Sequence, residues 1–140
     1  MALTATLPTA LQTLIPGQRL ADVSLLSSTL AGGGGNNVNG ALVASTTQTQ
    51  AGGTKLTYGI NSVLTANASD AVTMPKAASG TTLFLVNHSG QTIQLFPFKG
   101  DAINAAGTDA VVSVVTATTS IYTCSATTTQ WWGGPITNET

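Results

Sequence analysis

The chain has 140 residues, of which only 6% are Asp, Glu, Lys or Arg, and its formal net charge is -1. This length suits one folded domain with one core and is too short for two ordinary domains. The four cations, Arg19, Lys55, Lys76 and Lys99, are scattered, which disfavours nucleic-acid binding because that function needs a clustered basic surface. A charge-poor, nearly neutral surface favours association with protein surfaces, including copies of the same chain, and a neutral monomer is the alternative.

The first residues, MALTATLPTALQTLIPG, lack the cationic start and the long apolar run of a secretory signal. No segment has the length that spans a bilayer. Cys124 is the only cysteine, so neither an intrachain disulfide nor a cysteine-based zinc site is expected, and a buried thiol is the predicted state. We therefore expect synthesis in the cytoplasm, no membrane partner and no cofactor.

Residues 1–40 differ from the rest of the chain, because they carry repeated leucines interrupted by prolines and end in the glycine-rich run AGGGGNNVNG. A short helix is expected over 19–30, and the glycines after it predict a linker. A solvated tail has no need of repeated leucines, so we interpret this region as an arm that docks on another protein, with a frayed tail as the alternative. The residues assigned to the arm are Leu11, Leu14, Ile15, Leu20, Val23, Leu26 and Leu30.

From residue 41 onward, short apolar runs alternate with turn residues at a spacing of about eight to twelve residues, which is typical of a sandwich or barrel. Threonine fills many polar positions, and its branched Cβ suits a pleated sheet. We predict an all-β, antiparallel β-sandwich or jelly-roll-like single domain over 41–134, with an extended N-terminal arm and linker over 1–40 and a tail over 135–140. The expected strands cover 41–49, 55–59, 62–66, 71–75, 81–87, 91–98, 110–117, 119–126 and 129–133.

The stretch VNHSGQTIQLFPFKGDAIN raises the question of catalysis, because it holds the only histidine, His88, beside Ser89 and upstream of Asp101. Adjacent residues of an extended chain point to opposite faces, so His88 and Ser89 are not expected to converge. Asn and His tolerate positive φ and Gly90 adopts it freely, so NHSG is predicted as a hairpin loop between two strands. We assign no catalytic residue and interpret the chain as non-enzymatic, with a small hydrolase as the formal alternative.

The loop KGDAINAAGTDA carries Asp101, Asn104 and Asp109, which resembles a fragment of a calcium-binding loop. The spacing does not match an EF-hand loop, and no Glu follows at the position that would supply a bidentate ligand. Asp and Asn side chains that cap their own backbone explain the same residues, with a weak Ca²⁺ site as the alternative. No metal site is predicted.

Trp131 and Trp132 are adjacent, so on a strand at most one belongs to the core and the other is exposed or lies at an interface. Large aromatic side chains anchor subunit contacts, and an exposed tryptophan on a charge-poor chain would otherwise promote aggregation. We therefore assign the two tryptophans to an interface. Stacking on a sugar is the alternative role.

The region over about 51–132 resembles a module that is common among virion proteins of tailed bacteriophages. The resemblance rests on the order of short elements: Val86-Asn87, Leu95-Phe96-Pro97, Gly100-Asp101-Ala102-Ile103-Asn104, the strand 111–115, Tyr122-Thr123-Cys124 and Trp131. It implies a non-enzymatic part of the phage particle, such as a head decoration (cement) protein or a fibre-like accessory protein, commonly a β-rich homotrimer. It supplies no catalytic residues, and residues before 41 lie outside it.

We therefore expect a capsid decoration protein that oligomerises on the head of a tailed phage and stabilises it. Its expected partners are the major capsid protein and its own copies, and its expected location is the capsid surface of the virion. A tail- or fibre-associated module that recognises host glycans through Trp131 or Trp132 is the alternative.

Overall fold

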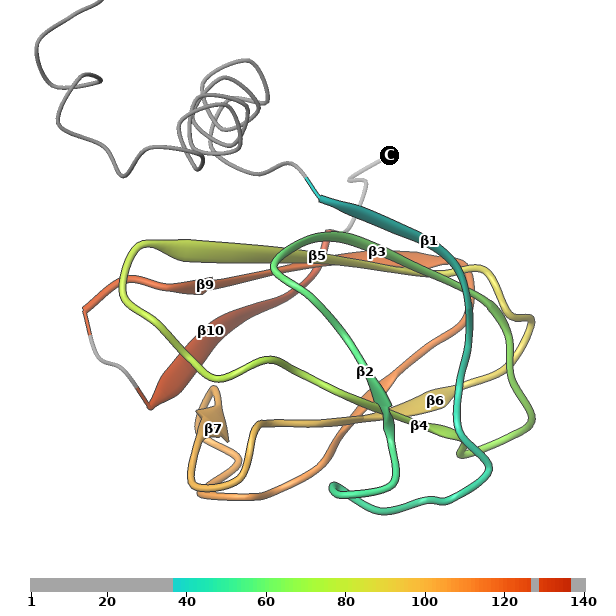
Figure 1. The fold of residues 1–140 in the computed structure, drawn as a ribbon, viewed down its shortest axis with the longest axis horizontal. Coiled ribbons are helices and arrows are strands. Elements are labelled where there is room, and N and C mark those ends of the chain that lie inside the picture. Colours follow the sequence, from blue (N-terminus) through green and yellow to red (C-terminus); the bar gives the residue numbers. More distant parts are fainter. Residues whose placement is uncertain (1–36, 127–128, 137–140) are drawn as a thin grey trace, which may run out of the picture. The chain divides into compact units, whose positions relative to one another are not determined.

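The computed structural model describes residues 37–126 and 129–136, which form an all-β fold, as the sequence predicted (Figure 1). The described residues contain no helix, and they belong to a compact unit that begins at Asn37. The predicted helix over 19–30 and all seven residues assigned to the arm lie outside the described residues. The strands are β1 (Val38–Val43), β2 (Thr54–Lys55), β3 (Gly59–Thr65), β4 (Ala71–Thr73), β5 (Thr81–Asn87), β6 (Ile93–Phe96), β7 (Ala102–Ile103), β8 (Val112–Val114), β9 (Thr118–Cys124) and β10 (Gln130–Pro135).

The strands form two sheets, and the core lies between them (Figure 1). One sheet has six strands in the order β1-β3-β5-β9-β10-β7, and the other has four in the order β2-β4-β6-β8. Strand β5 shows how the sequence places side chains, because Leu83, Leu85 and Asn87 are buried whereas the residues between them are partly exposed. The largest fully buried side chains include Trp131, Met74, Leu83, Leu85, Ile93, Leu95 and Ile103.

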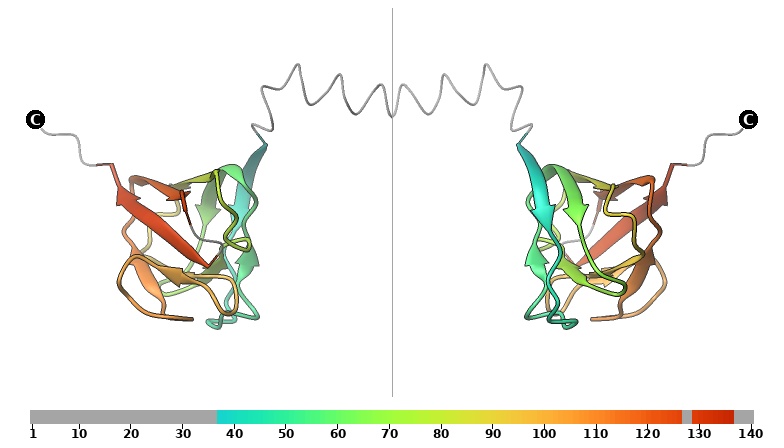
Figure 2. Two further views of the ribbon diagram at one scale, coloured as in Figure 1. Left: turned by 90° about the vertical axis from the view of Figure 1, so that its left-hand side faces the viewer. Right: turned by 90° about the vertical axis from the view of Figure 1, so that its right-hand side faces the viewer.

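The first six strands alternate between the two sheets, so the chain winds in coils instead of folding back in hairpins (Figures 1 and 2). Strands β1, β3 and β5 are parallel neighbours in one sheet, and β2, β4 and β6 are parallel neighbours in the other. After β6 the pattern changes, because β8 runs antiparallel to β6, β9 to β5 and β10 to β9. In each sheet, the parallel strands from the first part of the chain are therefore followed by antiparallel strands from the last part.

This topology corrects two predictions. The two sheets are mixed instead of antiparallel, since five of the eight strand pairs among the described residues are parallel. The prediction of a hairpin at NHSG is also wrong, because the two strands that this loop joins are not neighbours. Strand β5 lies between β3 and β9, whereas β6 lies between β4 and β8 in the other sheet. Residues 88–92 form a corner that carries the chain from one sheet to the other.

Asn87 holds this corner from the inside. Its side chain is fully buried, and Nδ2 donates hydrogen bonds to the backbone oxygens of Gln91, at 2.8 Å, and Val114, at 3.0 Å. Its Oδ1 accepts a hydrogen bond from Ser89 Oγ at 2.7 Å. A buried amide that is paired on both sides stabilises the direction in which the chain leaves β5. Gly90 has the expected positive φ, at 79°.

Candidate functional site

The outer side of the six-stranded sheet carries a row of apolar side chains across four adjacent strands. The strand register places Val38 opposite Ile60, Ile60 opposite Phe84, and Phe84 opposite Ile121. The next residue along β5, Leu85, points into the core, which places Phe84 on the outside because side chains alternate. Cross-strand neighbours on one face have Cβ atoms about 5 Å apart, so these four side chains form a continuous apolar row.

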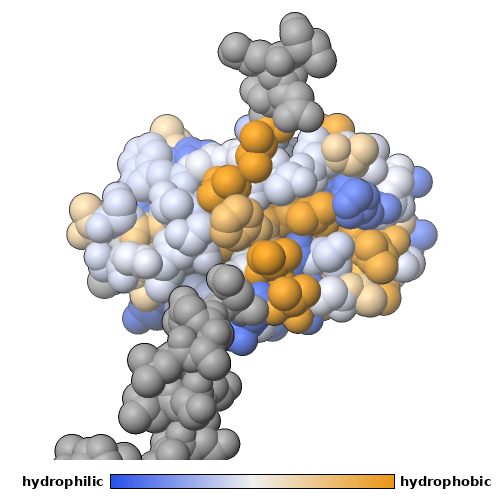
Figure 3. Space-filling model, turned by 90° about the horizontal axis from the view of Figure 1, so that it is seen from above, coloured by the Kyte–Doolittle hydropathy of each residue, from blue (hydrophilic) through white to orange (hydrophobic). Residues whose placement is uncertain are grey.

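Further apolar side chains flank this row. Leu64 is 49% exposed, Trp132 49% and Ile136 51%. The backbone nitrogen of Ile136 donates a hydrogen bond to the oxygen of Thr119 at 2.7 Å, which extends the pairing of β10 with β9. Figure 3 shows hydrophobic residues gathered on this side of the molecule. We call this surface the outer apolar face, and its residues are Val38, Ile60, Leu64, Phe84, Val86, Ile121, Trp132 and Ile136.

The outer apolar face carries no charge. Strands β1, β3, β5, β9 and β10 contain no Asp, Glu, Lys, Arg or His. The polar residues that alternate to the outside are Ser62, Thr82, Thr119 and Thr123, whose hydroxyl groups can both donate and accept hydrogen bonds. A partner that covers this face would therefore not have to desolvate a charge, which is the usual cost of burying a surface. A protein surface of similar character is the kind of partner that fits.

The two tryptophans lie on opposite sides of β10, as alternation predicted. Trp131 is 0% exposed, and its ring lies in the core with its centroid 6.4 Å from that of Tyr58. Its Nε1 has no hydrogen-bond partner among the described residues. Because the Trp131 ring is covered by the chain itself, Trp132 is the tryptophan that can carry the predicted interface, which stays a prediction.

Two of the three side chains that were considered for catalysis, those of Ser89 and Asp101, are used by the fold itself. Ser89 Oγ donates its hydrogen bond to the corner residue Asn87. Asp101 is only 2% exposed, and its carboxylate accepts a hydrogen bond from the backbone nitrogen of Ala77 at 2.6 Å. His88 is exposed at the corner. Among the described residues, no hydrogen bond is found that would join Ser89, His88 and Asp101 into a catalytic relay.

Asp109 and Asn104 anchor loops. Asp109 Oδ1 accepts hydrogen bonds from Gln50 Nε2, at 2.9 Å, and the Gly100 nitrogen, at 2.7 Å, and these bonds lower the pKa of the Asp109 carboxyl. Asn104 pairs with both backbone groups of Gly133, donating to its oxygen at 2.7 Å and accepting from its nitrogen at 2.9 Å. The prediction that Asp and Asn side chains cap the backbone of their own loop is confirmed for Asp109, but it is wrong for Asn104, which binds β10, and for Asp101, which binds Ala77. Over residues 37–126 and 129–136, no group of three or more His, Cys, Asp or Glu side chains could hold a metal ion.

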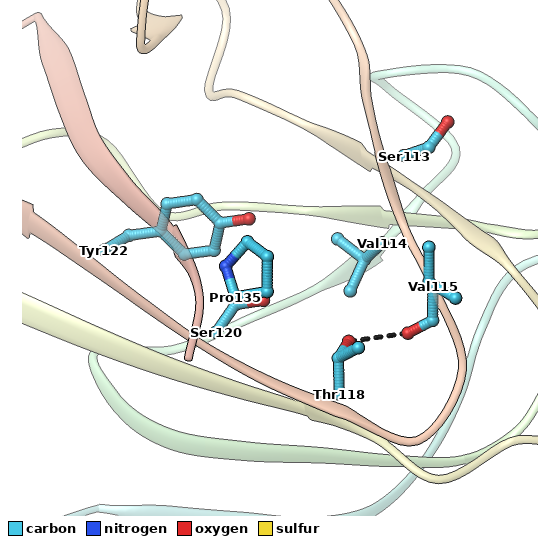
Figure 4. Close-up of a pocket in the computed structure, with 7 residues that line it drawn as sticks. All are labelled: Ser113, Val114, Val115, Thr118, Ser120, Tyr122 and Pro135. Carbon is cyan, nitrogen blue, oxygen red and sulfur yellow. Dashed lines mark hydrogen bonds between the residues drawn. The ribbon is translucent and has the colours of Figure 1, made fainter. Parts of the chain in front are cut away.

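A small pocket lies beside β9 (Figure 4). On one side of the pocket, Thr118 Oγ1 donates a hydrogen bond to the Val115 oxygen at 2.6 Å. Tyr122 also lines the pocket, and burial raises the pKa of its hydroxyl group. The pocket volume of about 60 Å³ has room for water but not for a substrate, since ligand sites usually have about 300–1,000 Å³. The pocket is lined by Ser113, Val114, Val115, Thr118, Ser120, Tyr122 and Pro135.

Most of the outer apolar face was missed in the sequence, where only its tryptophan was assigned to an interface. The available signal was in TTLFLVN, the residues of β5, which is apolar at both alternating sets of positions. Leu83 and Leu85 face the core, while Phe84 and Val86 face outward. A strand with one solvated face alternates apolar and polar residues, so an uninterrupted apolar run indicates that both faces of the strand are covered.

Comparisons of the chain with protein-family models, curated proteins and solved structures found no match. The part of the chain that the structure describes contains no helix that is long and apolar enough to cross a membrane. Function is therefore inferred from the outer apolar face and from the composition of the chain.

Proposed function

We propose that this chain is a non-enzymatic structural protein of a virus particle, a capsid decoration (cement) protein that oligomerises on the head of a tailed phage and stabilises it. The observation that carries this proposal is the outer apolar face, an uncharged surface on a hydrogen-bonded sheet. Monomeric soluble proteins rarely expose contiguous apolar patches larger than a few hundred Å². Such a surface suits a lasting contact with another protein.

In this proposal the two regions of the chain have different roles. The β domain contacts its own copies, which in the proteins that the chain resembles commonly form a homotrimer. Residues 1–40 act as an extended arm that clamps the major capsid protein through its leucines. Burial of apolar surface contributes about 25 cal/mol per Å² before the costs of association, and repetition over a shell adds avidity to each contact.

The test is co-sedimentation of the full chain with heads of the virus that encodes it, beside a chain that lacks residues 2–30. We expect the full chain to pellet with the heads and the shortened chain to stay in the supernatant with an unchanged β-sheet circular dichroism spectrum. A shortened chain that binds heads with the same affinity would contradict the arm as the clamp. A full chain that never pellets with heads would contradict the decoration function.

Trp132 supports a second candidate function, a glycan-binding module of a phage tail or fibre. Trp132 is 49% exposed, and Thr123 lies opposite it on β9, where its hydroxyl donates a hydrogen bond to the Trp132 backbone oxygen at 3.4 Å. An exposed indole beside a hydroxyl group can stack on a sugar while the hydroxyl binds its polar groups. Binding on a glycan array that is lost in Trp132→Ala, and kept in Val115→Ala on another part of the surface, would favour this function. Decoration predicts no binding to sugars.

A further inference from the structure

We propose that the outer apolar face is covered by the same face of a second copy of this chain, so that two molecules pair face to face about a two-fold axis. This inference rests on the self-association in the proposed function, names the surface and its occupant, and replaces the homotrimer that the resemblance implies with a pair of chains. Its test uses the isolated chain and needs no virus particle, so pairing and attachment to heads can fail separately.

The chemistry of the face makes it complementary to itself. In a two-fold contact the same patch occurs on both sides, so a charged patch would repel its own copy. The strands that form the outer apolar face have no charged residue, and the whole chain has a formal net charge of only -1. Apolar side chains can therefore meet apolar side chains. The serine and threonine hydroxyls between them serve equally as donors and acceptors, so they too can pair with their own kind.

The size of the face is sufficient for a specific pair. Five adjacent strands, β1, β3, β5, β9 and β10, at a spacing of about 4.8 Å give a width of about 24 Å. Strands β3, β5 and β9 have seven residues each, which at about 3.3 Å per residue gives the face a length of about 23 Å. Two such faces would bury roughly 1,100 Å² in total, which exceeds the roughly 1,000 Å² that separates biological interfaces from accidental ones.

The rest of the described surface offers no second row of this kind. Across the four-stranded sheet, the register places Lys55 beside Thr73 and Thr73 beside Phe96, so the corresponding row begins with a charge. Two of the other exposed apolar residues, Val111 and Val115, flank the three-residue strand β8, and the remaining ones are Val43, Tyr58 and Phe98. A head-to-tail contact needs two different complementary patches, whereas a two-fold contact needs only the one that is present.

The experiment measures the mass of the full chain by sedimentation velocity over a concentration series. We expect wild type to have twice the 14.0 kDa mass of one chain. Ile60→Lys puts an ammonium group in the middle of the apolar row of both copies, and we expect it to weaken pairing at least tenfold. The matched control is Val115→Lys, at a residue that is 57% exposed and follows β8 of the four-stranded sheet, and it should pair like wild type.

A second face variant covers the case in which Ile60→Lys lowers the melting temperature below that of the control. Val38 is 68% exposed at the end of the row, so Val38→Lys adds the same charge with little disturbance within the chain, and it should also weaken pairing. A wild-type mass of one chain or of three chains would overturn the proposal, and so would pairing that survives both face variants. Unpaired chains that still bind heads would overturn pairing alone, and paired chains that do not bind heads would overturn the decoration function alone.

Discussion

The two sheets differ in what covers their outer sides. On the four-stranded sheet, Thr73 points outward but is only 2% exposed, because the chain itself crosses over it and the Gln50 oxygen accepts a hydrogen bond from Thr73 Oγ1 at 2.7 Å. Lys55 Nζ donates to the same oxygen at 3.0 Å. On the six-stranded sheet, the described residues leave the outer apolar face partly to largely exposed.

This difference follows from the hydrogen-bonding capacity of the two surfaces. An irregular loop brings backbone groups that need partners, and hydroxyl and ammonium groups such as those of Thr73 and Lys55 can supply them. The outer apolar face has hydroxyl groups only at Ser62, Thr82, Thr119 and Thr123, and its Val, Ile, Leu, Phe and Trp side chains accept no hydrogen bonds, so a loop laid over them would leave many of its polar groups unpaired. The polar sheet can therefore be covered by its own loop, whereas the apolar sheet suits a cover of apolar side chains from another molecule.

The largest expected effect is a difference in stability loss between substitutions on the inner and outer sides of β5. Leu85 is 0% exposed in the core, and Leu85→Ala should lower the free energy of unfolding by about 2–5 kcal/mol. Val86, the next residue, faces outward, and Val86→Ala should cost less than about 1 kcal/mol in the unpaired chain. Urea denaturation, at protein concentrations low enough that the chain is unpaired, measures the free energy of unfolding of both variants. Equal losses would mean that the outer side of β5 is packed as tightly as the core.

The corner between the sheets should give the next largest effect. Asn87→Ala removes the buried amide and leaves the oxygens of Gln91 and Val114 without that donor, which should cost about 1–3 kcal/mol. Ser89→Ala removes only the hydroxyl that donates to Asn87 and is the matched control, with an expected cost of about 1 kcal/mol or less. The measurement is thermal unfolding of both variants. A larger loss for Ser89→Ala would show that the exposed part of the corner, and not Asn87, holds it.

The loop over the four-stranded sheet should depend on one hydroxyl. Thr73→Val keeps the shape of the side chain but removes its hydrogen bond to the Gln50 oxygen, with an expected loss of about 1 kcal/mol. Hydrogen exchange in residues 45–53 should become faster. Thr82→Val, on the outer side of the six-stranded sheet, is the control and should leave that exchange unchanged. Unchanged exchange in Thr73→Val would mean that the loop is held by other contacts.

The smallest expected effect is a pH dependence at Asp109. Hydrogen bonds from Gln50 and Gly100 hold its pKa in the folded chain below the ordinary value of 3.8. The charged carboxylate therefore adds stability above pH 3.8, and this contribution is lost as the pH falls through the folded pKa. Stability curves of wild type and Asp109→Asn should differ at neutral pH and converge in acid. The gap should be small because Asp109 is exposed, and a gap that widens in acid would have the wrong sign.

Local features of the sequence were reliable where they depend on alternation alone. The strand predicted over 81–87 has the same bounds in the structure, the only cysteine is buried, and the two tryptophans lie on opposite sides of β10. The strand predicted over 41–49 ends at Val43, and the residues after it form the loop that covers the other sheet. The two-residue strand β7 was not predicted, because two residues carry no readable period.

The sequence by itself determined that the chain forms strands, that neighbouring residues of a strand point to opposite sides, and that its surface is poor in charge, because each depends on residue type and on the two-residue period of a strand. Only the tertiary structure decided which strands are neighbours. Pairing depends on contacts between residues far apart in the chain, such as Phe84 with Ile121 or Asn87 with Val114, and a local pattern does not record them. For the same reason the outer apolar face became visible only when β1, β3, β5 and β9 were placed side by side.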